Sequence, residues 1–421
     1  MSTDVVVMGG GVVGITAAYE LARDGARVTL LERGAELGWA CSAGNAGMVS
    51  STHALPLASP SALRQGLRWM WRRDSPFYMR PRPGLLPWLA RFTAASTPGR
   101  AERAGRLLLA LCEAGLSRHA AFHDAGLDTG FVRDGLLDAY ESPAGLEFGR
   151  AEVELRHRLG LTGELLDAER LRELEPALGN GLAGGAYYSD QAYCDPLRFV
   201  HAIGAEARAL GVDVRCRVEA LGFATSGRRL AAVRTTAGEV SADQFVLAAG
   251  AWSPALAREL GVFLPIEAAK GYHVEFAASE QTPRLPIYMM ESKVVATPLD
   301  GRLRLSGTLE LDGLDLRVDP VRVNAIVQAG ERHFPGVRAV VTHDVWRGLR
   351  PCAPDGLPIV GRAPQLDNLM LATGHGMAGT TLAPVTAQLV ADVMASRPPE
   401  FSLDLMRPDR FRPLWTRPRR R

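Results

Sequence analysis

The stretch DVVVMGGGVVGITAAYELARDGARVTLLERG, residues 4–34, decides the fold of this chain. Its apolar run from Val5 to Met8 predicts a buried strand, and the glycines that follow lead into a helix with one apolar face. A second strand is predicted from Arg27 to Leu31. Strand, glycine turn, helix and strand in this order predict a parallel α/β sheet.

The glycines at positions 9, 11 and 14 have the spacing G-x-G-x-x-G. The first allows a tight turn, the second lets a pyrophosphate approach the backbone, and the third lets helix and strand pack closely. The helix start offers amide groups and partial positive charge to phosphates. Glu32 ends the second strand, where its carboxylate can accept hydrogen bonds from both hydroxyls of an adenosine ribose. The pattern therefore predicts a Rossmann-type site for a dinucleotide, either NAD or FAD.

The loop ACSAGNAGMVS, residues 40–50, is small and polar. Glycines at 44 and 47 would let its backbone approach a large flat ligand, and Ser42 would cap the chain toward a phosphate. The alternative is an ordinary surface loop.

Length and composition limit the class of protein. A chain of 421 residues exceeds what one core supports, which favours two interleaved domains. Its 48 basic and 46 acidic side chains leave a net charge of +2, so we expect no nucleic-acid partner. Five cysteines stand singly without a C-x-x-C pair, and no histidine spacing suits a metal; this favours a reducing compartment and no metal site. We find no signal peptide or membrane span and expect a cytoplasmic protein.

Residues 55–98 interleave aromatic and basic side chains. Such a block is typical of a membrane interface or an acidic partner, and would place the protein peripherally on the inner face of the membrane. It is equally typical of a packed excursion whose arginines reach solvent. The arginine-rich tail, residues 417–421, is predicted to be a solvated end.

The middle of the chain departs from the parallel pattern. A long helix is predicted over 100–123, with His119 and His123 on its surface. Three predicted strands, 266–276, 287–297 and 302–310, indicate an antiparallel sheet. The buried strand 244–249 returns to the nucleotide-binding part. We therefore expect a discontinuous dinucleotide domain (1–54, 191–262 and 346–421) interleaved with an α+β substrate domain (55–190 and 263–345).

The stretch ATGHGMAGTTLAP, residues 372–384, predicts a second glycine turn that opens a helix over 380–394, capped by Thr380 or Thr381. A second polarised helix start suits a second anionic group. A reduced flavin carries negative charge at N1 and the C2 oxygen, whereas a nicotinamide ring carries none, so the turn favours FAD. The two helix starts would hold opposite extremities of one elongated cofactor.

Five motifs in this order resemble the FAD-dependent D-amino-acid dehydrogenases of the glycine oxidase and D-amino-acid oxidase superfamily. They are the N-terminal glycine motif, SAGNAGMVS (42–50), KGYHVEF (270–276), WRGLRPCAPDGLPIVG (346–361) and GHGMAG (374–379). The resemblance implies that residues 374–377 line the flavin pyrimidine edge, that residues 45–47 approach the isoalloxazine and that Val218 contacts the adenine side. The complete predicted cofactor set is Gly9, Gly11, Val12, Val13, Gly14, Glu32, Arg33, Ser42, Asn45, Ala46, Gly47, Met48, Val218, Ala249, Gly250, Trp252, Gly374, His375, Gly376, Met377, Ala378, Gly379 and Thr380.

Arg350 is the best candidate for substrate binding. It follows an apolar strand and precedes a proline, where a buried guanidinium needs a partner. A substrate carboxylate would supply one, as the superfamily's matching arginine implies. Asp355 is the internal alternative, and Arg347 is expected on the opposite strand face. His375, Tyr272 and Tyr288 complete the predicted catalytic set.

The resemblance implies flavin-dependent oxidative deamination of an amino acid, expected to be a D-amino acid, by hydride transfer from the α-carbon to FAD N5. Electrons would pass to a quinone or another carrier, and no side-chain base is required. The FAD is expected to be non-covalent, because Cys352 does not match the register of a tethering cysteine. Alternatives are an amine oxidase of the glycine or sarcosine type that uses oxygen, and a non-catalytic FAD-binding redox sensor.

Overall fold

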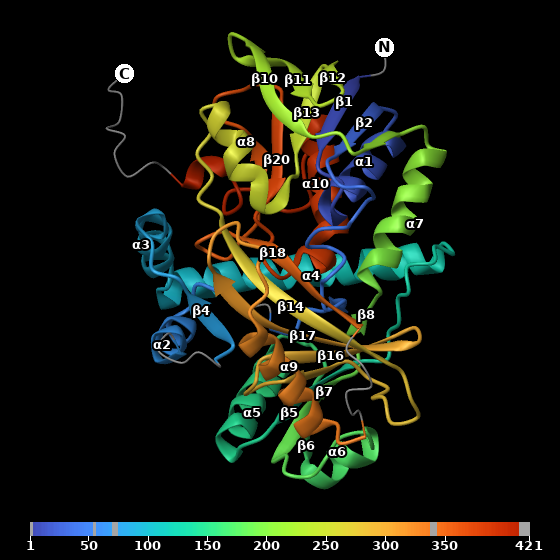
Figure 1. Ribbon diagram of the computed structural model, residues 1–421, viewed down its shortest axis with the longest axis vertical. Coiled ribbons are helices and arrows are strands. Elements are labelled where there is room, and N and C mark those ends of the chain that lie inside the picture. The colour runs from blue at the N-terminus through green and yellow to red at the C-terminus, as the bar shows by residue number, and fades with distance from the viewer. Residues whose placement is uncertain (1–2, 54–55, 70–74, 337–342, 412–421) are drawn as a thin grey trace.

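Two sheets, one above the other in Figure 1, organise the chain in the computed structural model, which describes residues 3–53, 56–69, 75–336 and 343–411. The upper sheet has six strands in the order β19-β20-β13-β1-β2-β9, all pairs being parallel except β19–β20. The strands are β1 (Asp4–Met8), β2 (Arg27–Glu32), β9 (Asp213–Cys216), β13 (Gln244–Leu247), β19 (Ile359–Arg362) and β20 (Leu369–Thr373). The parallel unit predicted from residues 4–34 is confirmed.

Alternate side chains of β1 enter two different cores, as the period of a strand requires. Val5 and Val7 pack with α1 (Val12–Arg23), α7 (Pro196–Ala209) and α10 (Gly379–Met394). Val6 and Met8 pack with α8 (Ser253–Glu259) and the small sheet on the other face. That sheet comprises β10 (Ala220–Ser226), β11 (Arg229–Thr235) and β12 (Gly238–Ser241).

The starts of α1 and α10 are neighbours, which corrects the expectation that they hold opposite extremities of the cofactor. A Cβ placed on Gly379 would lie 3.9 Å from Val12 Cγ1. The two helices pack side by side on one face of the sheet, so their N-termini meet. Neither threonine caps α10: Ala378 is the N-cap and offers no side-chain cap, while Thr381 Oγ1 donates to the carbonyl of Met48 at 3.0 Å.

The lower sheet runs in the order β18-β14-β17-β16-β15-β5-β7-β6, with β4 beside β17. Its pairs are antiparallel except β15–β5 and β17–β4. One strand predicted over 287–297 is wrong, because the turn at 290–293 divides it into β15 and β16. The strands are β4 (Phe77–Met79), β5 (Leu136–Tyr140), β6 (Glu164–Asp167), β7 (Gly184–Tyr188), β14 (Glu267–Ala277), β15 (Ile287–Met289), β16 (Val294–Leu299), β17 (Arg302–Leu311) and β18 (His343–Cys352).

Helices cover this sheet. The predicted α+β character is confirmed: α9 packs on β14 and β17, and α5 and α6 pack near β5 and β7. β18, which carries Arg350, pairs with β14, although the sequence analysis grouped residues 346–421 with the dinucleotide part. The domain boundaries stay a prediction. The helices are α5 (Pro143–Arg158), α6 (Ala168–Leu174) and α9 (Pro320–His333), and a separate short pair comprises β3 (Met48–Val49) and β8 (Ala192–Tyr193).

The long helix α4 (Pro98–Asp124) crosses the molecule between the sheets (Figure 1). The expectation that His119 lies on a helix surface is wrong. It is fully buried against α10, and its Nε2 lies 2.9 Å from the carbonyl oxygen of Thr380. Burial lowers the pKa of His119 to about 4, so the ring is neutral and donates this hydrogen bond.

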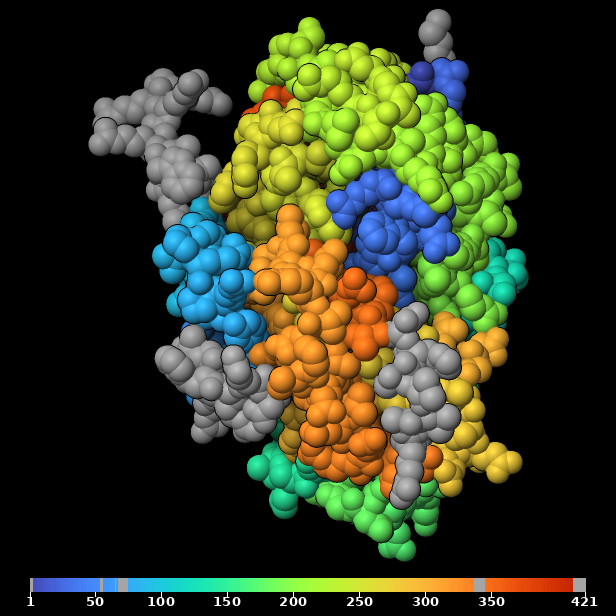
Figure 2. Space-filling model, in the orientation of Figure 1, coloured from blue at the N-terminus to red at the C-terminus, as the bar shows by residue number. Residues whose placement is uncertain are grey.

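The block at 55–98 forms α2 (Pro60–Trp69), β4, a short 3₁₀ turn (Pro83–Leu85) and α3 (Leu86–Ala95). Figure 2 shows its described part in blue on one flank of the molecule. Trp88 is 5% exposed, donates Nε1–H to the carbonyl of Cys352 at 2.9 Å and stacks on Phe92. These contacts favour the packed excursion for α3. Trp71 and the tail 417–421 lie outside the described residues.

Within the described ranges, no helix is long and apolar enough to cross a bilayer. The same part of the chain contains no group of three or more His, Cys, Asp or Glu side chains that could hold a metal ion.

Candidate functional site

Glycine is required at one position of the turn between β1 and α1 and at one position in the first turn of α1. Gly9 has φ +111°, and a Cβ on it would lie 2.5 Å from the carbonyl oxygen of Ala248. A Cβ on Gly14 would lie 1.9 Å from the carbonyl oxygen of Gly9. Ser42 Oγ accepts the hydrogen bond of Val12 N–H at 2.9 Å, so Ser42 lies at the start of α1. The turn brings the start of α1 close to the end of β1, as a phosphate site requires.

Glu32 organises the tip of β2. Its carboxylate is buried and accepts hydrogen bonds from the amides of Gly10 and Gly34, both at 2.6 Å, and from Trp39 Nε1 at 2.9 Å. Val218 donates its amide to the carbonyl of Glu32 at 2.9 Å. These bonds hold the Glu32 carboxylate at the tip of β2, where it was predicted to bind the ribose hydroxyls.

Arg33 and Trp252 pair beside Glu32. The guanidinium carbon of Arg33 lies 3.8 Å from the centre of the Trp252 ring, a cation–π distance. Trp252 belongs to the 3₁₀ turn Gly250–Trp252, which begins just after Ala249. The Arg33 side chain is 32% exposed, so it covers the ring from the solvent side. Arg33, Ala249, Gly250 and Trp252 thus lie in the neighbourhood that the adenine-side prediction requires.

The loop predicted to approach the isoalloxazine is tied to the second glycine turn. Asn45 Oδ1 accepts from the amide of Gly47 at 2.8 Å, and Asn45 Nδ2 donates to the carbonyl of Met377 at 3.2 Å. Thr297 Oγ1 of β16 donates to the carbonyl of Ala46 at 2.7 Å. The loop therefore joins the upper sheet to the lower one.

The second glycine turn leads from β20 into α10. Gly374 and Gly376 have φ of +77° and +55°, and Gly376 donates its amide to Pro351 of β18. His375 is buried, with Nε2 3.0 Å from Thr386 Oγ1 in α10. Burial lowers the pKa of His375 to about 4, so the imidazole is neutral. His375 stabilises the turn, and its role in catalysis stays a prediction.

A cavity of about 500 Å³ lies where the two sheets meet. Asn45, Ala46 and Met48 contribute to its wall from the first loop, and residues 374–378 contribute from the second glycine turn. Arg350 and Tyr288 face it from the lower sheet, while β4 and α3 add an apolar wall. The structure thus brings both predicted flavin loops and the predicted substrate arginine to one space.

Arg350 reaches this cavity without an acidic partner among the described residues. Its Nη1 donates to the carbonyl of Thr308 at 2.8 Å. The guanidinium lies across Gly271, where an added Cβ would be 2.1 Å from Nη1. Asp355, the internal alternative, pairs with Arg410 at 2.8 Å instead. Arg347 is exposed on the opposite strand face, as predicted, and donates to the carbonyl of Leu316.

The two predicted tyrosines have different positions. Tyr288 lines the cavity, and burial raises the pKa of its hydroxyl, so the group is a hydrogen-bond donor at neutral pH. Tyr272 does not line it: the side chain is buried toward α9, and its hydroxyl accepts the amide hydrogen of Asp319 at 3.2 Å. Neighbouring residues of β14 face opposite sides, so the register that aims Gly271 at Arg350 aims Tyr272 away.

Three cavity residues with an unusual backbone conformation were not predicted from the sequence. His53, Lys293 and Thr308 have φ of +56°, +56° and +63°, and all three line the cavity. Only five non-glycine residues of the described chain have positive φ, so three of the five residues with this strained backbone line one cavity. Backbone strain in a β-branched residue such as Thr308 leaves no sequence signal. Lys293 does leave one, since the chain has only two lysines.

Comparison with known proteins decides the family. Residues 4–393 match the family DAO, described as FAD dependent oxidoreductase. The chain belongs to this family. A D-amino acid dehydrogenase of Paramagnetospirillum magneticum is 37% identical over 421 aligned residues, which cover 97% of this chain and 98% of the relative.

Solved structures share the fold of this DAO-family protein. Glycine oxidase from Geobacillus kaustophilus superposes with a TM-score of 0.80 over 98% of this chain and 100% of its own, at 22% identity. L-alpha-glycerophosphate oxidase from Mycoplasma pneumoniae, solved with FAD bound, has a TM-score of 0.69 at 19% identity and covers 94% of this chain and 95% of its own.

FAD is the cofactor, as in the DAO family, and the residues of this structure fit it. The glycines at 9 and 14 leave no room for side chains at the start of α1. A buried carboxylate stands at the tip of β2, and no side chain caps α10. Cys352 lines the cavity, and burial raises the pKa of its thiol to about 12. This protein is an FAD-dependent oxidoreductase, similar to the D-amino acid dehydrogenases.

Proposed function

We propose that this protein removes the amino group of a D-amino acid by oxidation at the α-carbon. The observation that carries the proposal is Arg350, a cation without an acidic partner among the described residues, in the cavity that both flavin loops line. A bidentate carboxylate partner would satisfy its remaining donors. The relative named D-amino acid dehydrogenase supports the D configuration.

The described lining of the cavity has no Asp or Glu side chain. Arg350 orients the substrate carboxylate, and the Tyr288 hydroxyl is a second donor in the same space. A cationic wall disfavours an ammonium group and favours an amine that binds neutral, with its own lone pair. Such an amine needs no side-chain base at the α-carbon. When bound, FAD supplies the acceptor for the hydride that leaves this carbon.

The released imine hydrolyses to a keto acid and ammonia. Electrons then pass to a quinone or another carrier rather than to oxygen, in line with the dehydrogenase name of the relative. The FAD is held without a covalent bond, because a thiol that stays protonated is a poor nucleophile.

An anaerobic screen tests this function. FAD-loaded protein is mixed with each enantiomer of common amino acids, and bleaching of the flavin is recorded. We expect D-amino acids to bleach it faster than their L forms, and dye reduction in air to exceed oxygen consumption. Bleaching by dithionite but by no amino acid would indicate a redox sensor, and fast oxygen consumption with glycine or sarcosine would indicate an oxidase.

A further inference from the structure

A second group of hydrogen-bond donors lines the cavity with Arg350. Lys293 Nζ lies 5.5 Å from the centre of the Tyr288 ring, and the His53 ring packs edge-on against the same ring with centres 5.0 Å apart. Burial and the charge of Asp138 raise the pKa of the Tyr288 hydroxyl, and the positive charge of Arg350 lowers it. Tyr288 therefore contacts Lys293 and His53, and the charge of Arg350 also acts on it across the cavity that all four residues line.

Lys293 has no ion pair or side-chain hydrogen bond with any described residue. The two acidic groups whose charges act on Lys293 are occupied by other partners. Asp138 is fully buried and accepts from His53 Nε2 at 2.9 Å and from the hydroxyls of Tyr140 and Tyr188. Glu291 accepts from two backbone amides and from Ser142 Oγ. Apart from its contact with the Tyr288 ring, the ammonium group of Lys293 is therefore available to bind a ligand in the cavity.

The choice of lysine at this position is itself unusual. Of the 48 basic residues, 46 are arginines, and Lys270 and Lys293 are the only lysines. Lys270 is buried in an ion pair with Glu310 at 3.1 Å. Lys293 is held in a left-handed backbone conformation by the turn between β15 and β16, which aims it at the cavity. The ammonium group is a compact point charge with three donors, which can bind a carboxylate of the ligand.

Several hydrogen-bond donors in the cavity have no partner among the described residues. Arg350 has used one of its five donors on Thr308, and Lys293 adds three. Ser306 Oγ and Thr308 Oγ1 are buried in the same wall without a described hydrogen-bond partner. One α-carboxylate offers about four lone pairs, too few for this set. A ligand with a second anionic group would satisfy it.

We propose that the substrate carries a second carboxylate on its side chain, which binds Lys293, with His53 beside it, while Arg350 holds the α-carboxylate. The inference rests on the proposed function and narrows the substrate to acidic amino acids of the aspartate and glutamate type. The His53–Asp138 pair contributes no net charge when His53 is protonated, so Lys293 is the cation that distinguishes an acid from its amide.

Isosteric substrate pairs test the subsite with the FAD-loaded enzyme. We expect kcat/KM for D-glutamate or D-aspartate to exceed that for the matching amide, D-glutamine or D-asparagine, by about tenfold or more. Lys293→Met should reduce this ratio by a similar factor, and Lys293→Arg should retain most of it. Equal values for acid and amide in both pairs would overturn the proposal, as would a Lys293→Met variant that slows acid and amide alike.

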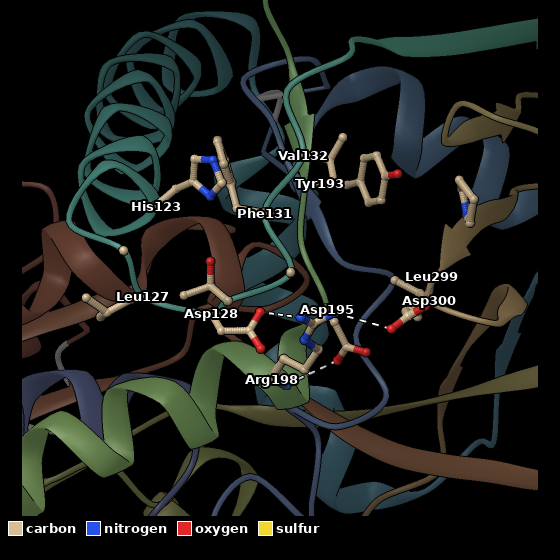
Figure 3. Close-up of a pocket in the computed structure, with 14 residues that line it drawn as sticks. His123, Leu127, Asp128, Phe131, Val132, Tyr193, Asp195, Arg198, Leu299 and Asp300 are labelled. Atoms are coloured by element: carbon tan, nitrogen blue, oxygen red, sulfur yellow. Dashed lines mark hydrogen bonds and ion pairs between the residues drawn. The ribbon is translucent and has the colours of Figure 1, made fainter.

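The chain offers a matched control in a second cavity, of about 650 Å³, lined by Arg198 and His123 among others (Figure 3). Arg198 already pairs with Asp128 and lies 3.8 Å from Asp300. Arg198→Met removes a cation from this cavity alone, so it should leave the acid-to-amide ratio unchanged. A fall as large as that of Lys293→Met would contradict a specific subsite.

A binding measurement separates this inference from the proposed function. Glutarate has the carbon chain of butyrate with a second carboxylate on its end, and neither compound has an amine to oxidise. We expect glutarate to perturb the flavin absorption at a concentration about tenfold lower than butyrate does, and Lys293→Met to remove the difference. This result supports the subsite even when no amino acid bleaches the flavin. Equal affinities overturn the subsite even when D-alanine is turned over.

Discussion

Arg350 owes its position to two neighbours on different strands. Thr308 of β17 supplies the carbonyl that accepts from Nη1, and Gly271 of β14 leaves the space for the guanidinium. Thr308 is also the point where the β14–β17 register shifts, between Lys270 and Tyr272. A bulge of this kind re-aims backbone groups at a site.

The hydroxyl of Thr308 is a test of whether the cavity is built for a ligand. Thr308→Val keeps the β-branched shape and the strained backbone but removes a buried hydroxyl without a partner. Without ligand, the free energy of unfolding should stay equal or rise by about 1 kcal/mol, because an unsatisfied polar group is lost. With substrate, kcat/KM should fall several-fold. Urea unfolding of the apoprotein and dye-reduction kinetics measure the two effects, and a large loss of apoprotein stability would refute the reasoning.

Cys352 makes a second prediction at the residue scale. Because burial raises the pKa of its thiol to about 12, the thiolate that a flavin linkage requires is scarce at neutral pH. Acid precipitation of the yellow protein should therefore leave FAD in the supernatant and a colourless pellet. Colour that remains with the pellet would show a covalent bond.

At the scale of elements, the clearest predictions came from strong periodicity. β1, α1 and β2 follow from the alternation and glycine spacing of residues 4–34. The division of 287–297 into β15 and β16 could not be predicted, because the turn at 290–293 contains no glycine or proline to mark it. Lys293 lies in that turn, so a sequence that does not mark the turn does not place Lys293 at the cavity either, although the rarity of lysine singles the residue out.

The start of α1 can be tested with one methyl group. In Gly14→Ala the new Cβ would lie 1.9 Å from the carbonyl oxygen of Gly9, and the backbone must move. We expect FAD affinity to fall by about 100-fold or more, since displaced phosphate contacts cost several kcal/mol. FAD titration of the apoprotein measures it.

Gly99→Ala is the matched control, because Gly99 is in α4 and a Cβ there would have no neighbour within 4 Å. Alanine should stabilise that helix by about 0.5–1 kcal/mol and leave FAD affinity unchanged. If both variants bind FAD as the wild type does, the start of α1 is not the phosphate site.

At the scale of the whole molecule, the site exists because the two sheets meet. The order of motifs predicted FAD and the substrate arginine, but which face each residue of β14 presents depends on register. Tyr272 and Tyr288 could not be distinguished from the sequence, because both are tyrosines in strands and only one faces the cavity. The burial of His119 likewise depends on α4 crossing to α10.

Buried neutral histidines give the fold a pH dependence. Desolvation lowers the pKa of His119 and His375 to about 4, below the value of about 6.5 in the unfolded chain. Between these values the unfolded state binds more protons, so stability is lost as the pH falls from about 6.5 toward 4. His119→Gln keeps a donor for the Thr380 carbonyl and should make the slope shallower by up to about 1.4 kcal/mol per pH unit. Urea unfolding at several pH values measures the slope, and an unchanged slope would contradict a neutral buried His119.

The most direct test of the central claim is the rate at which one D-amino acid reduces the bound flavin anaerobically in two arginine variants. Arg350→Met removes the cation that is proposed to bind the α-carboxylate, and Arg347→Met removes a cation three residues away on the opposite face of β18. We expect kcat/KM for reduction to fall by about 100-fold or more in Arg350→Met and to stay within about twofold of the wild type in Arg347→Met. Equal rates in wild type and Arg350→Met would contradict the claim that Arg350 holds the substrate carboxylate.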